Sequence, residues 1–122
     1  MKYIAIIFFS LSIVFLLGMD LAKGPKCIVT AYCACEKCCG DHADGITASG
    51  HVIEQGDKFC AAPPEIPFKT MLIIEGYNNG KAVPVLDRGG AIKGNHFDVY
   101  FDTHTEALAW GVRKCEVQYE RD

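Results

Sequence analysis

Short runs of β-branched and aromatic residues, each ended by glycine, proline or asparagine, recur along most of the chain. Runs of this length and composition are typical of β-strands bounded by turns. They occupy residues 26–33, 51–62 with a turn at Gly56, 70–75, 82–86, 96–102 and 112–120. An exposed edge strand promotes aggregation, and a closed barrel has none. We therefore predict a mainly-β domain in which about six short strands close into a small barrel.

Two signals refine the strand pattern. Asn79-Gly80, between the runs 70–75 and 82–86, favours a β-hairpin. Pro84 cannot donate a ladder hydrogen bond, so its strand is expected to lie at an edge or to be bulged there.

One short helix is expected after the run 96–102. Thr103 can cap its N-terminus, and Glu106 three residues later completes a capping box. Gly111 stands where a helix commonly ends, so the helix should end just before it.

The first 22 residues differ from the rest of the chain. One lysine is followed by an almost unbroken apolar run to Leu17, a pattern typical of a secretory signal peptide or a membrane anchor. We therefore predict residues 1–22 to be a signal or anchor and residues 23–122 to be one domain. The domain would be secreted, or held at the membrane facing the cell wall or periplasm.

The charge balance argues against one class of partner. The chain has 12 Lys and Arg residues against 15 Asp and Glu residues, a net charge of −3. No basic stripe appears, so binding to nucleic acid has no electrostatic support.

The chain contains seven cysteines, and in a small exported domain disulfides are the usual reason for so many. Because seven is odd, at least one cysteine is free, bound to a metal or paired between chains. The seven are Cys27, Cys33, Cys35, Cys38, Cys39, Cys60 and Cys115.

A metal site is the alternative use of these cysteines. Cys35-x-x-Cys38 has the spacing of a zinc-binding pair, His42 is close in sequence, and His51 or Cys60 could complete the site. A second well-spaced pair is missing, so we favour structural disulfides and expect no cofactor, with zinc as the alternative.

The stretch HFDVYFD, residues 96–102, alternates strictly between apolar and polar side chains. That period predicts a strand with one buried face, whose other face carries Asp98, Tyr100 and Asp102. These residues could be an ordinary solvated face, or they could form a site in which Asp98 is reactive.

The segment VLDRGGAIKGNHFDVYFDTHTEALAWG, residues 85–111, resembles the 3D domain, named for three aspartates and shared with membrane-bound lytic transglycosylase A. The family pattern is an aspartate, then Gly-Gly-Ala-Ile-x-Gly, then an aspartate that opens a short hydrophobic strand. The matching residues are Asp87, Gly89, Gly90, Ala91, Ile92, Gly94 and Asp98.

The resemblance extends upstream through TAYC at residue 30 and DGITASG at residue 44, as in small cell-wall proteins. The order of TASG, AAP, NNG and DRGG is also similar to rare lipoprotein A and, more loosely, to expansins. The likeness runs roughly from Thr30 to Trp110 and implies a double-psi β-barrel.

The resemblance implies a lytic transglycosylase that acts on peptidoglycan, with Asp98 as the acid/base. Cleaving the bond between N-acetylmuramic acid and N-acetylglucosamine requires a proton on the leaving oxygen, which a carboxylic acid of raised pKa can supply. Ordinary glycosidases need a second carboxylate. In a lytic transglycosylase the C6 hydroxyl of the sugar attacks instead, so one carboxyl can act first as acid and then as base.

Two further aspartates are candidates to assist Asp98. Asp87 would raise its pKa by like-charge repulsion if their strands are neighbours, or it could hold a loop amide or the sugar. Asp102 would share the face of Asp98 if the strand runs straight that far, but it also precedes the predicted helix and could assist its cap. Arg88 is expected to form a salt bridge within its loop.

Other residues are candidates for binding the substrate. Gly89 and Gly90, with Gly94, are expected to allow positive φ and close approach of another chain or of a sugar. Tyr100 shares the predicted face of Asp98 and could stack on a sugar ring. Thr47 is expected in a turn, from which it could line the groove.

Three functions are compatible with these features. The first is an exported, peptidoglycan-cleaving lytic transglycosylase whose partners are glycan strands, and a partner protein could complete the open cleft of so small a domain. The second is a non-catalytic wall-binding module, as expansin-like barrels are expected to be. The third is a metal-dependent hydrolase built on the Cys/His cluster.

Overall fold

The computed structural model describes residues 24–40 and 43–120. The predicted signal or anchor segment, residues 1–22, and the candidate ligand His42 lie outside the described residues. None of the helices within 24–40 and 43–120 combines the length and the apolar character that crossing a bilayer requires.

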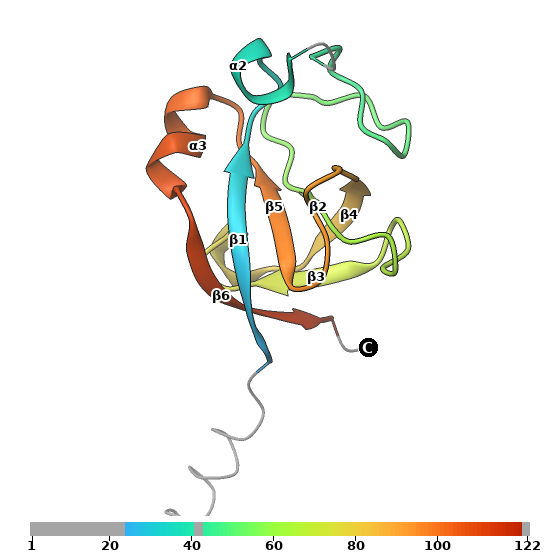
Figure 1. The fold of residues 1–122 in the computed structure, drawn as a ribbon, viewed down its shortest axis with the longest axis vertical. Helices are drawn as coiled ribbons and strands as arrows, with labels where there is room; N and C mark the ends of the chain where they lie inside the picture. The colour runs from blue at the N-terminus through green and yellow to red at the C-terminus, as the bar shows by residue number, and fades with distance from the viewer. Residues whose placement is uncertain (1–23, 41–42, 121–122) are drawn as a thin grey trace, which may run out of the picture.

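Six strands form one closed barrel, whose ring of strands is seen in Figure 1. The order around the barrel is β1-β5-β2-β4-β3-β6, and β6 pairs back onto β1. The strands are β1 (Lys26–Tyr32), β2 (Cys60–Ala61), β3 (Met71–Ile74), β4 (Val83–Asp87), β5 (His96–Tyr100) and β6 (Arg113–Tyr119). Parallel pairing joins β1 to β5 and β2 to β4. The prediction of a mainly-β domain with six short strands is confirmed.

Residues 51–55 do not form the predicted strand, since Val52 makes only an isolated bridge to Ile46. The predicted turn at Gly56 is present, with a φ of 89°, and just after it the Asp57 carboxylate accepts a 2.8 Å hydrogen bond from the backbone N–H of Glu54. The N–H of Asp57 donates in return to the carbonyl of Glu54 at 3.1 Å. Local side-chain bonds of this kind compete with strand pairing, and here they replace it.

The hairpin between β3 and β4 is present, but its connection is longer than a two-residue turn. Asn78 and Asn79 adopt φ of 53° and 55° within the short 3₁₀ helix η2 (Asn78–Gly80). The expectation of an edge strand at Pro84 is wrong, because β4 lies between β2 and β3. The register of β4 against β2 does shift, close to Pro84, between the pairs Cys60–Val85 and Ala61–Asp87.

The predicted helix is α3 (His104–Trp110), and its caps are those expected. The Thr103 hydroxyl accepts from the backbone N–H of Glu106 at 3.1 Å and donates to the Glu106 carboxylate at 2.9 Å. Gly111 ends the helix with a φ of 68°. A second helix, α2 (Glu36–Cys39), was not predicted, and it buries none of its four residues. Both helices lie at the same end of the barrel, near the end of β1 (Figure 1).

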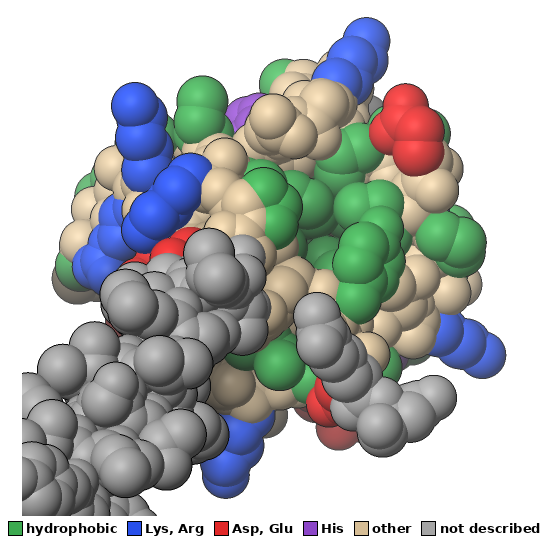
Figure 2. All heavy atoms as spheres, turned by 90° about the horizontal axis from the view of Figure 1, so that it is seen from below, with side chains coloured by type: hydrophobic (Ala, Val, Ile, Leu, Met, Phe, Trp, Pro, Cys, Tyr) green, Lys and Arg blue, Asp and Glu red, His purple; other side chains and the backbone are tan. Residues whose placement is uncertain are grey.

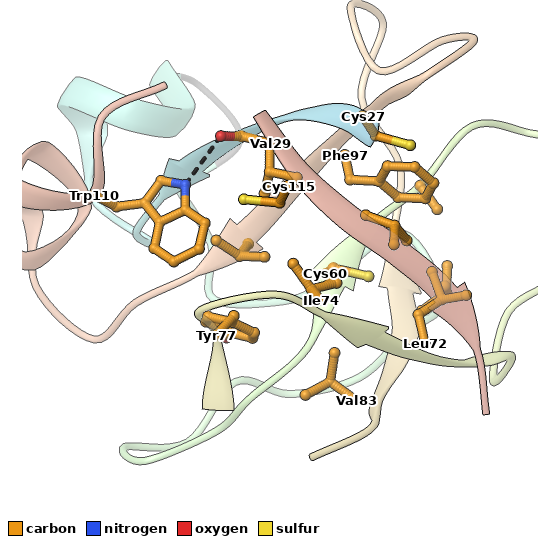
Figure 3. Close-up of a cluster of buried hydrophobic side chains, with 14 residues drawn as sticks. Cys27, Val29, Cys60, Leu72, Ile74, Tyr77, Val83, Phe97, Trp110 and Cys115 are labelled. Carbon is orange, nitrogen blue, oxygen red and sulfur yellow. Dashed lines mark hydrogen bonds between the residues drawn. The ribbon is translucent and has the colours of Figure 1, made fainter. Parts of the chain in front are cut away.

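The barrel interior is filled by side chains from all six strands (Figure 3). Val29, Val85 and Val99 have no exposed surface, and burial of such residues is the main stabilising contribution to folding. Trp110 reaches this core from α3, and its indole N–H donates to the carbonyl of Val29 at 3.0 Å, drawn as the dashed line in Figure 3. This contact fixes α3 against the barrel.

Hydrophobic side chains gather in the middle of the face seen in Figure 2, and lysine and arginine side chains stand around its margin. Several large hydrophobic residues within 24–40 and 43–120 are exposed, among them Ile28, Met71 and Tyr119. Some exposure of apolar side chains is common in folded domains, because polar residues cannot cover the whole surface.

Candidate functional site

The strand register places Asp87, Ala61, Asp98 and Thr30 in one row across four neighbouring strands. Ala61 of β2 pairs with Asp87 of β4 on one side and with Asp98 of β5 on the other. Asp98 pairs in turn with Thr30 of β1. Directly paired residues share a face of the sheet. The single methyl group of Ala61 between the two aspartates therefore leaves room for a hollow.

Asp87, Ala61 and Asp98 of this row form the floor of a cleft of about 560 Å³. One wall comes from residues 44–48, and another from Gly89, Gly90 and Ile92 of the glycine-rich loop. Tyr32, Cys38 and Cys39, from the end of β1 and from α2, complete the lining. A cleft with carboxylates on its floor and loops around its rim is suited to an extended, polar ligand.

Asp98 is partly buried on this floor, and its Oδ1 accepts a 3.0 Å hydrogen bond from the Thr30 hydroxyl. Burial raises the pKa of Asp98 to about 6, although the Thr30 hydrogen bond and the nearby His96 oppose this shift. Asp87 adds a smaller increase in the same direction. The expected cause, repulsion between neighbouring strands, is therefore secondary, because β2 separates β4 from β5.

The Thr30 hydroxyl links Asp98 to His96. It lies 2.9 Å from Nε2 of His96, whose Nδ1 lies 3.1 Å from the carbonyl of Ala91. A carbonyl only accepts, so Nδ1 carries a hydrogen. The single hydroxyl proton of Thr30 can then point to Asp98 or to His96. When the Thr30 proton points to a neutral His96, a protonated Asp98 can donate to the Thr30 oxygen. The hydrogen bonds through Thr30 can therefore stabilise a proton on Asp98.

Asp87 is fully engaged in holding the cleft together. Its Oδ2 accepts from the Tyr32 hydroxyl at 2.5 Å, and its Oδ1 accepts from the backbone N–H groups of Ala48 and Arg88, both at 2.9 Å. These bonds join β1, the 44–48 wall and the glycine-rich loop. Of the roles considered for Asp87, the structure shows the binding of loop amides.

Within residues 24–40 and 43–120, Arg88 does not form the expected salt bridge. Its guanidinium donates to the carbonyls of Ala62, Asp87 and Ile66, and it stacks 4.1 Å from the centre of the Phe68 ring. The Arg88 side chain thus binds backbone acceptors, while the Asp87 carboxylate binds the backbone N–H of Arg88.

The structure does not bring Asp102 into the cleft. β5 ends at Tyr100, and the exposed Asp102 accepts two 3.0 Å hydrogen bonds from the N–H of Gly56. Thr103, not Asp102, caps α3.

Tyr100 also lies away from the cleft, with only 4% of its surface exposed. Its ring stacks on Phe59 at 4.7 Å and meets Tyr32 edge-on at 5.9 Å. The polar face predicted for this strand is therefore covered at Tyr100, because the segment leading into β2 packs over it. Tyr32 is the tyrosine that reaches the cleft.

The other predicted binding residues do line the cleft. Thr47 is a buried turn residue, and its hydroxyl pairs with Ser49 at 3.0 Å. Gly89 and Gly90 do not have the positive φ expected of them, whereas Gly94 does, at 66°. A Cβ on Gly89 would lie 3.1 Å from Ile92, while a Cβ on Gly90 would meet nothing within 4 Å. Gly89 thus allows close packing of its own loop.

The expected disulfides are not formed, and all seven cysteines are free thiols. Instead, Cys33, Cys35, Cys38 and His104 bring one ligand atom each within 4.8 Å of one another. Donation from Cys33 lowers the pKa of Cys35 to about 6, because that hydrogen bond favours the thiolate.

Two of the cysteines first considered as metal ligands, Cys35 and Cys38, belong to this cluster, and their partners differ from those proposed. His51 is bound to Asp57 at 2.8 Å, and Cys60 is buried in the core.

Sequence reasoning missed Thr30 and His104. Thr30 lies in a strand whose register was not known, and His104 is separated from Cys38 by 66 residues. The TAYC motif was the one signal that pointed to Thr30.

Comparison with known proteins places Asp87 and Asp98 within a recognised domain. The model of the 3D domain matches residues 59–119, which include β2, β4 and β5. The chain is 36% identical over 77 residues to the cell wall-binding protein YocH of Bacillus subtilis, an alignment that covers 61% of this chain and 26% of YocH. It is 30% identical over 100 residues to the SPbeta prophage-derived uncharacterized protein YorM of the same organism, covering 80% of this chain and 42% of YorM.

Among solved structures, the chain is similar to MltA of Escherichia coli, a lytic transglycosylase. The match has 28% identity and a TM-score of 0.49, and it covers 61% of this chain and 26% of MltA. This chain therefore spans less than half the length of each of these proteins.

Proposed function

Since the chain belongs to the 3D-domain family, we propose that it is an exported, peptidoglycan-cleaving enzyme of the lytic transglycosylase type. Its barrel would have double-psi topology, and residues 1–22 would direct it to the cell wall as a signal peptide or an anchor. The name of the cell wall-binding relative supports the wall as the place of action. The observation that carries the proposal is the Asp98 carboxyl, which lies on the floor of the cleft with a pKa of about 6.

In the proposed reaction, the cleft binds a glycan strand so that the bridging oxygen between N-acetylmuramic acid and N-acetylglucosamine lies beside Asp98. Protonated Asp98 donates its proton to that oxygen as the C1–O4 bond breaks, and N-acetylglucosamine leaves with a free 4-hydroxyl group. The C6 hydroxyl of the N-acetylmuramic acid residue then attacks C1, and the Asp98 carboxylate accepts its proton. The product is a 1,6-anhydro sugar, no water is consumed, and Asp98 is again protonated.

The surroundings of Asp98 suit an acid that works alone. Asp87 lies two strands away, which is roughly 10 Å along the sheet, and its oxygens are occupied by Tyr32, Ala48 and Arg88. We therefore assign Asp87 a positioning role that holds the walls of the cleft. Thr30 can turn its hydroxyl proton toward Asp98 once the carboxylate has formed, which stabilises the ionised state between the two proton transfers.

The experiment is digestion of purified peptidoglycan by the full chain, followed by mass spectrometry of the soluble products. Anhydro ends are expected for the wild-type protein, and their loss is expected for Asp98→Asn. Glu65→Gln, which changes an exposed carboxylate outside the cleft, is the matched control and should retain activity. Reducing ends in place of anhydro ends would show hydrolysis, and equal product from Asp98→Asn would rule out Asp98 as the acid.

A non-catalytic wall-binding module is the second candidate, and the similarity to a cell wall-binding protein favours it. Co-sedimentation with insoluble peptidoglycan separates the two functions. If wild-type protein and Asp98→Asn both sediment with peptidoglycan and neither releases soluble product, the domain binds the wall without cutting it.

A further inference from the structure

We propose that Cys33, Cys35, Cys38 and His104 bind one Zn²⁺ ion in a tetrahedral, structural site. The four ligand atoms come from two parts of the chain. Cys33, Cys35 and Cys38 follow β1 and enter α2, while His104 is the first residue of α3. Figure 1 shows these two helices at the same end of the barrel.

The ligand atoms are gathered closely enough to surround one zinc ion, since all lie within 4.8 Å of one another. Sγ of Cys33 lies 3.0 Å from Sγ of Cys35 and 3.4 Å from Sγ of Cys38. Nδ1 of His104 lies 3.8, 3.6 and 3.3 Å from the sulfurs of Cys33, Cys35 and Cys38. A zinc tetrahedron with bonds of about 2.3 Å to sulfur and about 2.0 Å to nitrogen has edges of about 3.8 Å and about 3.6 Å. The ligands are thus close to their bound positions.

A disulfide would account for only part of this cluster. A disulfide needs sulfurs about 2.05 Å apart, and it would join only two of the three thiols. It would also not explain why Nδ1 of His104 lies beside all three sulfurs. A Cys₃His set is, by contrast, a common ligand set of structural zinc sites.

The surroundings show why a metal would be needed here. α2 has four residues, none of them buried, and its N-cap Cys35 makes no capping hydrogen bond with its side chain. A helix this short is not stable on its own, and no apolar packing compensates. A metal that joins α2 to α3 would supply the missing attachment, as metals do in many small domains.

The same ion would also shape the cleft. Cys38 and the adjacent Cys39 line the hollow that contains Asp98, so fixing α2 fixes one wall of it. All four zinc positions would be occupied by protein ligands, which leaves none for a water molecule. The site is therefore structural and does not support a metal-dependent hydrolase.

The test uses the full chain, purified under reducing conditions, loaded with Zn²⁺ and freed of unbound metal. Metal analysis is expected to show one zinc per chain. Substitution by Co²⁺ should give the thiolate charge-transfer band and the visible bands of a tetrahedral cobalt site. His104→Ala and Cys38→Ser should each weaken zinc binding by more than about a hundredfold, since loss of even an outer-shell partner costs about 10- to 100-fold.

Cys39→Ser is the matched control. Cys39 is adjacent to Cys38, but its thiol donates to the Cys33 carbonyl at 3.2 Å and is not part of the cluster. Its replacement should leave the metal content unchanged. The side chains of His104 and Cys38 are both only partly buried, so both variants should fold.

Three results would overturn the proposal. One is a folded wild-type protein without zinc after loading, and another is an unchanged zinc affinity in His104→Ala. The third is a disulfide that involves Cys33, Cys35 or Cys38 in folded protein isolated separately without reductant, detected by alkylation and mass spectrometry without reduction. Because metal content and cobalt spectra do not depend on peptidoglycan, the zinc proposal is tested independently of the enzymatic one.

Discussion

Replacing Asp98 by asparagine should stabilise the domain at neutral and alkaline pH while it removes the proposed activity. The folded protein raises the pKa of Asp98 from 3.8 to about 6, chiefly by burial. Well below both pKa values the carboxyl is protonated in the folded and in the unfolded state. Between these pKa values the unfolded chain releases the proton and the folded protein retains it, so wild-type stability falls as the pH rises.

The size of the effect follows from the shift in pKa. One pKa unit corresponds to about 1.4 kcal/mol, so the difference between 3.8 and about 6 amounts to at most about 3 kcal/mol. The asparagine side chain would carry no charge at any pH, and it would retain an oxygen that can accept from Thr30. The free energy of unfolding of Asp98→Asn, minus that of the wild type, should therefore grow by up to about 3 kcal/mol between about pH 4 and pH 8.

Urea denaturation of both proteins across this pH range measures the difference. Trp110 is the only tryptophan of the chain and is buried in the core, so its fluorescence reports unfolding. Glu65→Gln is the control, because water can solvate the exposed Glu65 carboxylate in both states. His96→Gln/Asp98→Asn shows how much of the pH dependence comes through the neighbouring His96. A difference between Asp98→Asn and the wild type that is the same at pH 4 and pH 8 would refute the argument that burial of Asp98 costs stability.

Three further predictions concern the cleft and helix α3. Release of anhydro products should fall as the pH rises through about 6, because Asp98 must be protonated to donate. His96→Gln should shift this fall to higher pH, since His96 lowers the pKa of Asp98. The pH–rate profiles of the two proteins check both points. Ala61→Val should reduce sedimentation with peptidoglycan, because the added methyl groups enter the floor of the cleft. The circular dichroism spectrum should be retained. Unchanged sedimentation would place the ligand elsewhere. Thr103→Ala should cost about 1 kcal/mol of stability in urea denaturation, the usual cost of losing an N-cap, whereas Thr103→Ser, which keeps the hydroxyl, should cost less.

Local sequence patterns were sufficient for features that depend on neighbouring residues. The alternation of residues 96–100 predicted β5, and Thr103, Glu106 and Gly111 predicted α3 together with both of its caps. These signals act through backbone dihedral preferences and hydrogen bonds between residues a few positions apart. Where a local side-chain bond competes with pairing, as between Asp57 and Glu54, the same reasoning predicted a strand that does not form.

The residues that share the cleft could be recognised only in part. The 3D-domain motif singled out Asp87 and Asp98, but it did not show that β2 separates them or that Asp87 is engaged by loop amides. Tyr100 and Asp102 follow the same alternation as Asp98, yet one is covered by Phe59 and the other lies beyond the end of β5. Periodicity predicts on which side of a strand a side chain lies, but it does not predict what packs over that side.

The amino-acid sequence by itself determined that this is a mainly-β domain with short strands and one well-capped helix, because these depend on interactions within a few residues. The tertiary structure alone decided that Thr30 meets Asp98 and that His104 meets three cysteines that lie between 66 and 71 residues earlier in the chain. Such encounters depend on the register and the closure of the barrel, which are set by the packing of all six strands together and by no single segment.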